Sequence, residues 1–316
     1  MNSPIFLSPL FMDRIWGGTK LKSFFNYNIP SDTVGECWGI SAHTNGDCVI
    51  LNGNYKGKTL SHLWDNHRDL FGNIKGDKFP LLTKILDSND NLSVQVHPDD
   101  KYAFINENGE LGKTECWYVI DCDDDAEIIL GHNATTKEEL TAMIHNNQWD
   151  SLLKRIKVKK GDFFYVPSGA IHALCKGSLI LETQQNSDTT YRVYDYNRTD
   201  SNGNTRELHL DKSIDVIQVP HNDFTTADFK IDKGENYTCT TFISNDFFSV
   251  YKLDTEGLSK FNHNKDFSLY SVIDGEGTII CEDITYPLNK GDHFILPHNI
   301  KYFEIDGNLE VIVSTI

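Results

Sequence analysis

An internal repeat of one strand-forming segment limits what this chain of 316 residues can fold into. Lys160–Pro167 reads KGDFFYVP and Lys290–Pro297 reads KGDHFILP, an offset of 130 residues. A second match, Val119–Asp121 against Val272–Asp274, has an offset of 153 residues. A Gly-Asp turn followed by an aromatic and aliphatic run that ends at proline is typical of a buried strand. The repeat therefore predicts two related β-units in one chain.

The two offsets differ by 23 residues (153 − 130), so the first unit holds an element that the second unit lacks. Residues 136–154 fill this gap, and Thr136 precedes Glu138 and Glu139 as in the first turn of a helix. Apolar residues near helical spacing also predict a helix over residues 60–71. The remaining short runs of Val, Ile, Phe and Tyr lie between turn-forming residues, which indicates a mainly β fold of sandwich or barrel type.

Charge and composition exclude several classes of partner. The net charge is -17 at pH 7, whereas binding to nucleic acid requires a basic face, so we expect no nucleic-acid partner. No apolar stretch is long enough to cross a bilayer and no cationic start precedes an apolar run, so we expect neither membrane insertion nor secretion. The seven cysteines are odd in number and include no Cys-x-x-Cys pair, which favours a reduced, cytoplasmic protein.

Metal-binding residue types occur at strand-like spacing in the first unit. Gln95 and His97 are two residues apart, so both side chains lie on one face of a strand, and Lys113 and Glu115 repeat this arrangement. His172 follows the repeated segment after a short spacer. Two imidazoles, a carboxylate and an amide oxygen suit Zn²⁺ or another borderline divalent ion. We therefore expect these four residues, Gln95, His97, Glu115 and His172, to form one divalent-metal site inside a β-barrel.

The repeat places this metal site in only one of the two units. At the offset of 130 residues His172 corresponds to Tyr302, and at the offset of 153 residues Glu115 corresponds to Ser268. The second unit therefore lacks both of the ligands that can be mapped onto it. We expect one metal site per chain, in the first unit, and a structural second unit.

These segments resemble a known superfamily and, within it, one family. Ser93–Pro98 is similar to the metal-binding strand of a cupin, and Pro167–His172 is similar to the second cupin motif, in which a histidine follows proline after a short spacer. The fuller pattern resembles type I mannose-6-phosphate isomerase in its short bacterial form. The segments that carry this resemblance are Arg14–Gly18, Gly35–Trp38, Phe79–Leu86, Leu92–Asp100, Gly112–Glu115 and Gly169–Ala173.

The resemblance implies two cupin-like jelly-roll β-barrel units with a small helical insert in the first. We expect a catalytic cupin domain over residues 1–230, with its insert near 136–154, and a second, metal-free cupin-like domain over residues 231–316. The implied activity is the zinc-dependent interconversion of mannose 6-phosphate and fructose 6-phosphate. The expected partner is accordingly a small phosphorylated sugar, with the protein acting as a monomer or homodimer.

The resemblance also implies roles for individual residues. It selects as metal ligands the same four residues that the spacing selects. It implies Asp188 and Arg192 as active-site residues, and Trp16, Ser93 and Lys113 as residues that line the pocket.

Aldose–ketose isomerisation moves a proton between C1 and C2, most simply through an enediol, and this step requires a general base. Lys113 and Asp188 are the two candidates, and the sequence does not choose between them. Lys113 and Arg192 can also add positive potential where the enediolate forms. Lys101, directly after the metal strand, and Arg198 are candidate cations for the phosphate group.

Three other functions remain open from the sequence. A cupin isomerase or epimerase of another phosphosugar would share the metal site, so only substrate assays distinguish it from a mannose-6-phosphate isomerase. A non-catalytic sugar-binding or regulatory bicupin would not need Lys113, Asp188 and Arg192 beside four metal ligands. A cupin dioxygenase more usually carries His-x-His on the first strand, where this chain has Gln95 in the first position.

Overall fold

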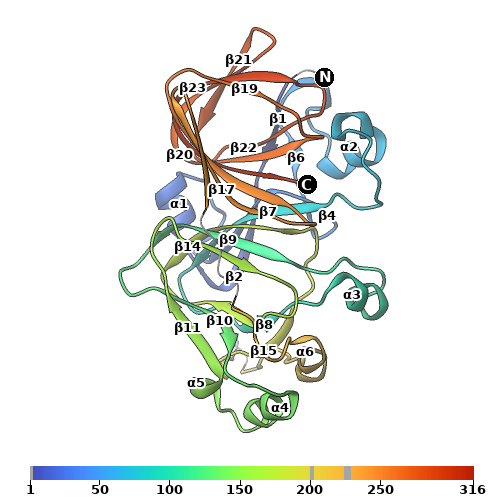
Figure 1. Ribbon diagram of the computed structural model, residues 1–316, viewed down its shortest axis with the longest axis vertical. Helices are drawn as coiled ribbons and strands as arrows, with labels where there is room; N and C mark the ends of the chain where they lie inside the picture. The colour runs from blue at the N-terminus through green and yellow to red at the C-terminus, as the bar shows by residue number, and fades with distance from the viewer. Residues whose placement is uncertain (1–2, 200–202, 224–228) are drawn as a thin grey trace.

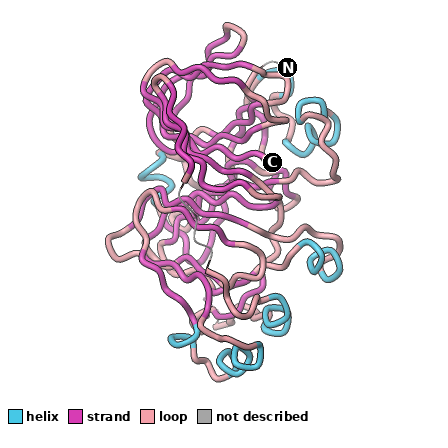
Figure 2. Tube along the Cα trace, in the orientation of Figure 1, coloured by secondary structure: helices cyan, strands magenta, loops and turns pink. Residues whose placement is uncertain are grey.

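The structure is a computed structural model that describes residues 3–199, 203–223 and 229–316. Strands dominate it, and the short helices lie at its periphery (Figure 2). Two β-units are stacked along the long axis of the molecule, with the second, coloured orange to red, above the first (Figure 1). The predicted mainly β fold with two cupin-like units is confirmed.

The first unit is a sandwich of two antiparallel sheets. In spatial order, its inner sheet contains β12 (Phe163–Val166), β9 (Glu115–Cys122), β14 (Ser178–Gln185), β7 (Leu81–Ser88), β3 (Val34–Ile40) and β2 (Leu10–Gly18). Its outer sheet contains β11 (Leu153–Lys157), β10 (Glu127–His132), β13 (His172–Leu174), β8 (Val94–Val96) and β15 (Tyr191–Tyr194). All residues of β3, β7 and β14 are buried, because both faces of the inner sheet are covered.

The second unit is built on one ten-stranded sheet. Its main path contains β16 (Lys230–Gly234), β17 (Tyr237–Ser244), β18 (Ser249–Glu256), β23 (Tyr302–Thr315), β20 (Ser268–Cys281), β22 (His293–Leu296), β1 (Ile5–Ser8) and β6 (Val49–Ile50). Beside this path, β19 (Ser259–Asn262) pairs with β23 and β21 (Ile284–Asn289) pairs with β20. A separate two-stranded sheet joins β4 (Ala42–His43) to β5 (Gly46–Asp47).

The strand registers support the repeat that the sequence predicts. Val166 and Leu296 occupy the same place in the two repeated segments. Val166 lies opposite Glu115, and Leu296 lies opposite Ser268, as the second offset requires. The spatial order β12-β9-β14-β7-β3-β2 in the first unit also recurs as β22-β20-β23-β18-β17-β16 in the second. The two units therefore share strand order as well as sequence.

Two strands from the start of the chain belong to the sheet of the second unit. β1 pairs with β22, with Ile5 opposite Ile295, and it also pairs with β6. The hydrogen-bonded sheets therefore cross the boundary that the sequence predicts at residue 230.

The predicted helical insert of the first unit lies between β10 and β11. It consists of α4 (Lys137–His145) and α5 (Trp149–Leu152), and the side chain of Thr136 caps α4 by accepting from the N–H of Glu139. The insert ends two residues before the predicted limit, because Leu153 begins β11.

The prediction for residues 60–71 is also confirmed, as α2 (Leu60–Asn66) and the 3-10 helix η2 (Arg68–Phe71). The other helices are α1 (Lys20–Phe25), η1 (Gly53–Tyr55), α3 (Asp100–Asn106) and α6 (Leu210–Val216). Among the described residues, no helix combines the length and the apolar character that a membrane span requires.

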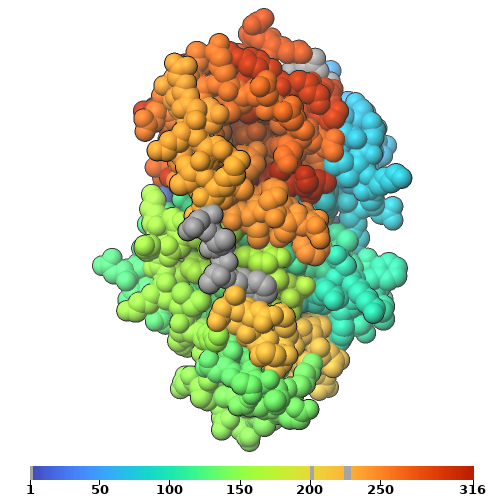
Figure 3. Space-filling view, viewed as in Figure 1, coloured from blue at the N-terminus to red at the C-terminus, as the bar shows by residue number. Residues whose placement is uncertain are grey.

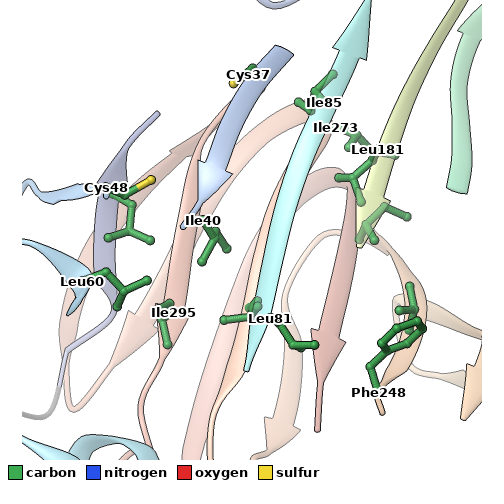
Figure 4. Close-up of a cluster of buried hydrophobic side chains, with 14 of the residues drawn as sticks. Cys37, Ile40, Cys48, Leu60, Leu81, Ile85, Leu181, Phe248, Ile273 and Ile295 are labelled. Atoms are coloured by element: carbon green, nitrogen blue, oxygen red, sulfur yellow. The ribbon is translucent and has the colours of Figure 1, made fainter. Parts of the chain in front are cut away.

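The largest apolar cluster lies between the two units (Figure 4). Ile40, Leu81 and Leu181 contribute to it from the inner sheet of the first unit, and Ile273 and Ile295 contribute from the second. Burial of apolar side chains stabilises such a contact by about 25 cal/mol per Å². A separate apolar cluster fills the space between the two sheets of the first unit, and another lies inside the second unit.

Candidate metal centre and active site

A cavity of about 260 Å³ opens between the two sheets of the first unit. Its walls carry cationic and acidic side chains from both sheets and from the connecting loops. The residues that line it are Arg14, Trp16, Glu36, Lys84, Leu86, Leu92, Ser93, Gln95, Lys113, Glu182, Asp188, Thr190, Arg192 and Arg206. Trp16, Ser93, Lys113, Asp188 and Arg192 thus lie where the sequence places them.

The folded chain brings His97, Glu115 and His172 together, with their ligand atoms all within 4.8 Å of one another. Nε2 of His97 is 3.4 Å from Oε2 of Glu115, and Nε2 of His172 is 3.4 Å from Oε1 of Glu115. Strand pairing causes this convergence, because His172 begins β13 opposite Gln95 of β8, while Glu115 begins β9 in the facing sheet. Among the described residues this is the only such group of three or more His, Cys, Asp or Glu side chains.

Backbone carbonyls orient both imidazoles toward the carboxylate. Nδ1 of His97 is 2.9 Å from the carbonyl oxygen of Thr189, and Nδ1 of His172 is 2.9 Å from that of Ala170. Because a carbonyl only accepts hydrogen bonds, each Nδ1 carries the proton and each Nε2 is an acceptor, which in His97 lies 3.1 Å from Nζ of Lys113. Burial lowers the pKa of His97 to about 3 and also lowers the pKa of His172, so both rings are neutral, as metal ligands must be.

Glu115 fits the role of an anionic metal ligand. Its side chain is fully buried, and Oε1 has no hydrogen-bond partner within the described part of the chain. Burial alone would raise the pKa of Glu115, but the ammonium of Lys113 at 2.6 Å lowers it well below its usual range, so the group is ionised. An ionised, buried oxygen without a donor is a position that a divalent cation satisfies.

Gln95 lies within reach of the same ion. Its side-chain amide is 3.3 Å from Nε2 of His172. Rotation of the amide by half a turn presents its oxygen instead of its nitrogen, so the amide can serve as a neutral ligand. The four residues selected from the sequence therefore lie together, and Gln95 among them lines the cavity.

Glu182 is a charged residue of the cavity that the sequence did not single out. It lies on β14, it is only 4% exposed, and its Oε2 accepts a hydrogen bond of 3.0 Å from Nε1 of Trp117. Its Oε1 is 3.9 Å from Nζ of Lys113, which also donates a 2.6 Å hydrogen bond to Oε2 of Glu115. Burial and the nearby charge of Glu115 raise the pKa of Glu182 to about 7.

Lys84 and Glu36 were also missed, and they form an ionic network beside Glu182. Nζ of Lys84 is 3.6 Å from Oε2 of Glu36 and 3.8 Å from Oδ1 of Asp188, and Nε of Arg14 donates to Oε1 of Glu36 at 2.8 Å. Burial would raise the pKa of Glu36, but Lys84 and Arg14 lower it to about 2. One signal in the sequence was available, since Lys84 interrupts the otherwise uncharged run Phe79–Leu86.

Arg192 lies directly beside the metal strand. Its backbone is opposite Gln95, its Nε donates to Oγ of Ser93 at 3.3 Å, and its Nη1 donates to the carbonyl oxygen of Glu207 at 3.0 Å. Within the described residues Arg192 forms no ion pair, and Asp188 pairs with Lys84 instead of with Arg192. Arg192 therefore offers the cavity a cation that no carboxylate neutralises.

The cations considered for the phosphate are placed differently from one another. Arg198 and Arg206 both bind Asp195, but only Arg206 lines the cavity. Lys101 is exposed on α3, which begins after the metal strand has ended, and it does not line the cavity. The geometry thus supports Arg206 in the role considered for Lys101 and Arg198.

The fold and this site define a bicupin with one candidate metal centre beneath a cationic cavity. Residues 5–120 match the family model described as phosphomannose isomerase type I, catalytic domain, and residues 238–316 match the model described as mannose-6-phosphate isomerase, cupin domain. The chain belongs to the type I mannose-6-phosphate isomerase family, as its sequence resemblance predicts.

Full-length relatives and solved structures agree with this assignment. The chain is 58% identical over 315 residues to mannose-6-phosphate isomerase ManA of Bacillus subtilis, covering 99% of both chains. It is 54% identical over 316 residues to mannose-6-phosphate isomerase of Streptococcus mutans, covering 99% of this chain and 98% of the relative. The crystal structure of mannose 6-phosphate isomerase from Bacillus subtilis superposes with a TM-score of 0.97 at 55% identity, covering 99% of this chain and 100% of that one.

A more distant structure shares the fold alone. A mutant of phosphomannose isomerase from Salmonella typhimurium superposes with a TM-score of 0.80 at 15% identity, covering 99% of both chains. The arrangement of two stacked β-units therefore persists where most of the sequence has changed.

Proposed function

We propose that this protein interconverts mannose 6-phosphate and fructose 6-phosphate in the cavity of its first unit. The observation that carries the proposal is the junction of a His97–Glu115–His172 metal centre with a cavity lined by buried Glu182 and several cations. A buried carboxylate with a pKa near 7 supplies a base, and Arg192, which pairs with no carboxylate among the described residues, suits an anionic substrate. Membership of the type I family, whose relatives carry this name, supports the same reaction.

The proposed metal is zinc, held by His97, Glu115, His172 and Gln95. Two neutral imidazoles, one carboxylate and one amide oxygen are ligands that Zn²⁺ accepts in catalytic sites. When bound, a divalent ion supplies Lewis acidity that stabilises negative charge on the substrate oxygens.

Glu182 is the general base in this proposal, in place of Lys113 or Asp188. Removal of the C2 proton of the aldose, and its return at C1, needs a carboxylate that faces the cavity and is shielded from water. Glu182 meets both conditions, and Trp117 fixes one of its oxygens. Asp188 is more exposed, with 33% of its side-chain surface accessible, and it is engaged by Lys84 and Asn45.

Lys113 and Arg192 stabilise charge in this proposal. The ammonium of Lys113 lies between Glu115 and Glu182, where it can donate to a substrate oxygen as negative charge develops there. Arg192 adds a second positive group from the strand beside Gln95. Arg206, at the edge of the cavity, is the proposed phosphate ligand, because a guanidinium matches phosphate oxygens in a bidentate manner.

The cell compartment that we propose is the cytoplasm. All seven cysteines are free thiols, most of them buried in apolar surroundings. A sugar phosphate is also a substrate of intracellular chemistry, since its charge prevents passage through a bilayer.

A coupled assay with mannose 6-phosphate, run before and after treatment with a chelator, tests the proposal. We expect activity to disappear when metal is removed and to return when zinc is added, with metal content measured on the same samples. Full activity in a metal-free sample would refute the metal-dependent mechanism. Other hexose 6-phosphates, assayed in parallel, test the alternative that the substrate is a different phosphosugar.

A further inference from the structure

The second unit contains a cavity of about 570 Å³, larger than the catalytic cavity of about 260 Å³. Figure 3 shows this unit hollowed on the side toward the viewer. The volume lies within the range of about 300–1,000 Å³ typical of small-molecule sites. The strands β17, β18, β19, β20 and β23 supply most of the wall, so the cavity is built on regular structure.

Strand positions around this cavity are the counterparts of those around the catalytic cavity. Lys84 lies opposite Glu182, and at the equivalent positions Tyr251 lies opposite Val313. The registers show which residue of the second unit stands at each position of the first. Tyr251 stands where the first unit has Lys84, and Val313 where it has Glu182. Cys239 stands where the first unit has Glu36, and Ser268 where it has Glu115. The second cavity thus occupies the place of an active site, with each of these charged groups exchanged for an uncharged one.

Aromatic rings form one part of the wall. The ring centroids of Tyr237 and Phe261 are 4.9 Å apart, and Phe261 stacks on Phe303 with centroids 5.1 Å apart. Tyr270 meets Phe303 edge to face at 6.1 Å. These mutual contacts hold the rings in fixed positions, so they offer a preformed apolar surface to a flat or chair-shaped ring.

Hydroxyl and amide groups form the other part of the wall. Nε2 of His263 is 3.0 Å from Oγ of Ser268, and Tyr251 hydrogen-bonds to both Ser268 and Tyr270. These hydrogen bonds fix the position of the Tyr251 hydroxyl beside the cavity.

Three further polar side chains of the wall have no side-chain hydrogen bond inside the described part of the protein. They are Thr241, Asn262 and Asn264. An apolar ligand that covered these groups would displace their water without replacing its hydrogen bonds. A ligand that carries hydroxyl groups satisfies them.

The charges around the cavity disfavour a phosphate ester. Lys265 and Asp232 are the charged residues that line it, one of each sign. The catalytic cavity has Arg14, Lys84, Lys113, Arg192 and Arg206 on its walls instead. A dianionic phosphate gains far less from one exposed lysine than from such a group of cations.

We propose that the second cavity binds an uncharged pyranose sugar, at a site separate from the metal centre. The aromatic wall packs against the apolar face of the sugar ring, and Thr241, Asn262, Asn264 and Tyr251 bind its hydroxyl groups. The site is non-catalytic, because the equivalents of the base Glu182, the cation Lys84 and the metal ligand Glu115 are Val313, Tyr251 and Ser268. This inference is independent of the function proposed for the first unit.

Titration of the full-length, metal-loaded protein with methyl α-D-mannopyranoside tests the proposal. This probe has no phosphate for the catalytic cations and no free anomeric carbon for isomerisation. We expect saturable binding of one molecule per chain by isothermal titration calorimetry. Phe261→Ala removes part of the aromatic wall, and Thr241→Phe fills the cavity, so each should weaken binding by at least about tenfold. The isomerase activity of both variants should equal that of the wild type, which also reports that they are folded.

Tyr251→Phe keeps the ring and removes one hydroxyl, and it decides the question if the larger changes disturb folding. We expect it to weaken binding by about fivefold to tenfold, consistent with loss of one hydrogen bond. Lys84→Ala, in the catalytic cavity, should leave binding of the probe unchanged. The proposal is overturned if no methyl glycoside of mannose, glucose or galactose binds saturably. It is equally overturned if Lys84→Ala abolishes binding while Phe261→Ala and Tyr251→Phe do not, or if benzoate binds in this cavity and the glycosides do not.

Discussion

The two β-units of this chain have the same strand order and the same register, but charged residues at the centre of the first unit are replaced by uncharged residues in the second. In the first unit Lys84 and Glu182 line the cavity between the sheets, and the buried Glu115 accepts a hydrogen bond from Lys113 of the same cavity. In the second unit the corresponding positions are Ser268, Tyr251 and Val313. The fold therefore determines where a site lies, whereas a few side chains on equivalent strands determine whether that site performs a reaction.

Replacement of a histidine at the metal centre should have the largest effect on the difference in activity between the two units. We expect His172→Ala to lose metal and to lower isomerase activity on the order of 10³-fold or more, because a ligand and its charge stabilisation are both removed. The measurements are metal content and the coupled assay. Ser268→Ala, the matched change in the second unit at the position equivalent to the ligand Glu115, should leave both values unchanged. An active His172→Ala protein would show that the reaction does not depend on this centre.

Replacement of the proposed base should separate catalysis from metal binding. Glu182→Gln keeps the shape of the side chain and removes its basicity, so kcat should fall by about 10²–10⁴-fold while metal content stays at one ion per chain. Val313→Thr is the nearly isosteric control at the equivalent position of the second unit, and we expect normal kcat for it. If Glu182→Gln retains kcat, Asp188 becomes the remaining candidate, and Asp188→Asn is the next variant to assay.

A smaller effect is expected at the edge of the catalytic cavity, where two arginines share the carboxylate of Asp195. Arg206→Ala should raise KM for mannose 6-phosphate about tenfold or more with little change in kcat, as loss of uniform binding predicts. Arg198→Ala is the matched control, because Arg198 makes the same ion pair but does not line the cavity. Equal KM values for the two variants would argue against a phosphate contact by Arg206.

The contact between the units gives a prediction about stability. His293 is buried there, with Nδ1 2.8 Å from Oγ of Ser271 and Nε2 3.1 Å from the hydroxyl of Tyr27, and burial lowers its pKa from 6.5 to about 4. Because His293 binds a proton more readily in the unfolded chain than in the folded one, lower pH favours unfolding. The contribution of neutral His293 to the free energy of unfolding is therefore present above pH 6.5 and is lost as the pH falls toward 4. The shift corresponds to roughly 3 kcal/mol in the free energy of unfolding.

Thermal unfolding between pH 7 and pH 4 measures this contribution. We expect His293→Gln to show a smaller fall in Tm over this interval than the wild type, although its Tm at pH 7 is lower. His298→Gln is the control, since His298 is near in sequence but partly exposed. Parallel pH profiles for His293→Gln and the wild type would mean that other buried groups control the acid sensitivity.

The sequence predicted those parts of the fold and site that depend on short spacing. Gln95 and His97 are placed on one face by the period of a strand, and Glu115 is tied to the repeat by the Val166 register. The helical insert was equally predictable, because Thr136 caps it locally. Such features need only a few neighbouring residues to identify them.

Other parts could not be predicted, because they arise from long-range packing. Glu182 and Lys84 lie on strands that are buried along their whole length, so alternation of polar and apolar residues does not mark the side that faces the cavity. The positions of Lys101 and Arg206 relative to the cavity depend on how α3 and the segment after β15 leave the sandwich. Sequence spacing contains no information about those directions.

The pairing of β1 with β22 has a consequence for how the protein is made. Ile5 pairs with Ile295 and Leu7 pairs with His293, so these strands join segments that are far apart in the sequence. Contacts this distant in sequence form slowly, because a very long loop must close before they stabilise anything. During synthesis β1 can pair with β6 early, but it must remain without β22 until the residues between β1 and β22 have followed. Truncation before β22 should expose that edge strand and favour aggregation.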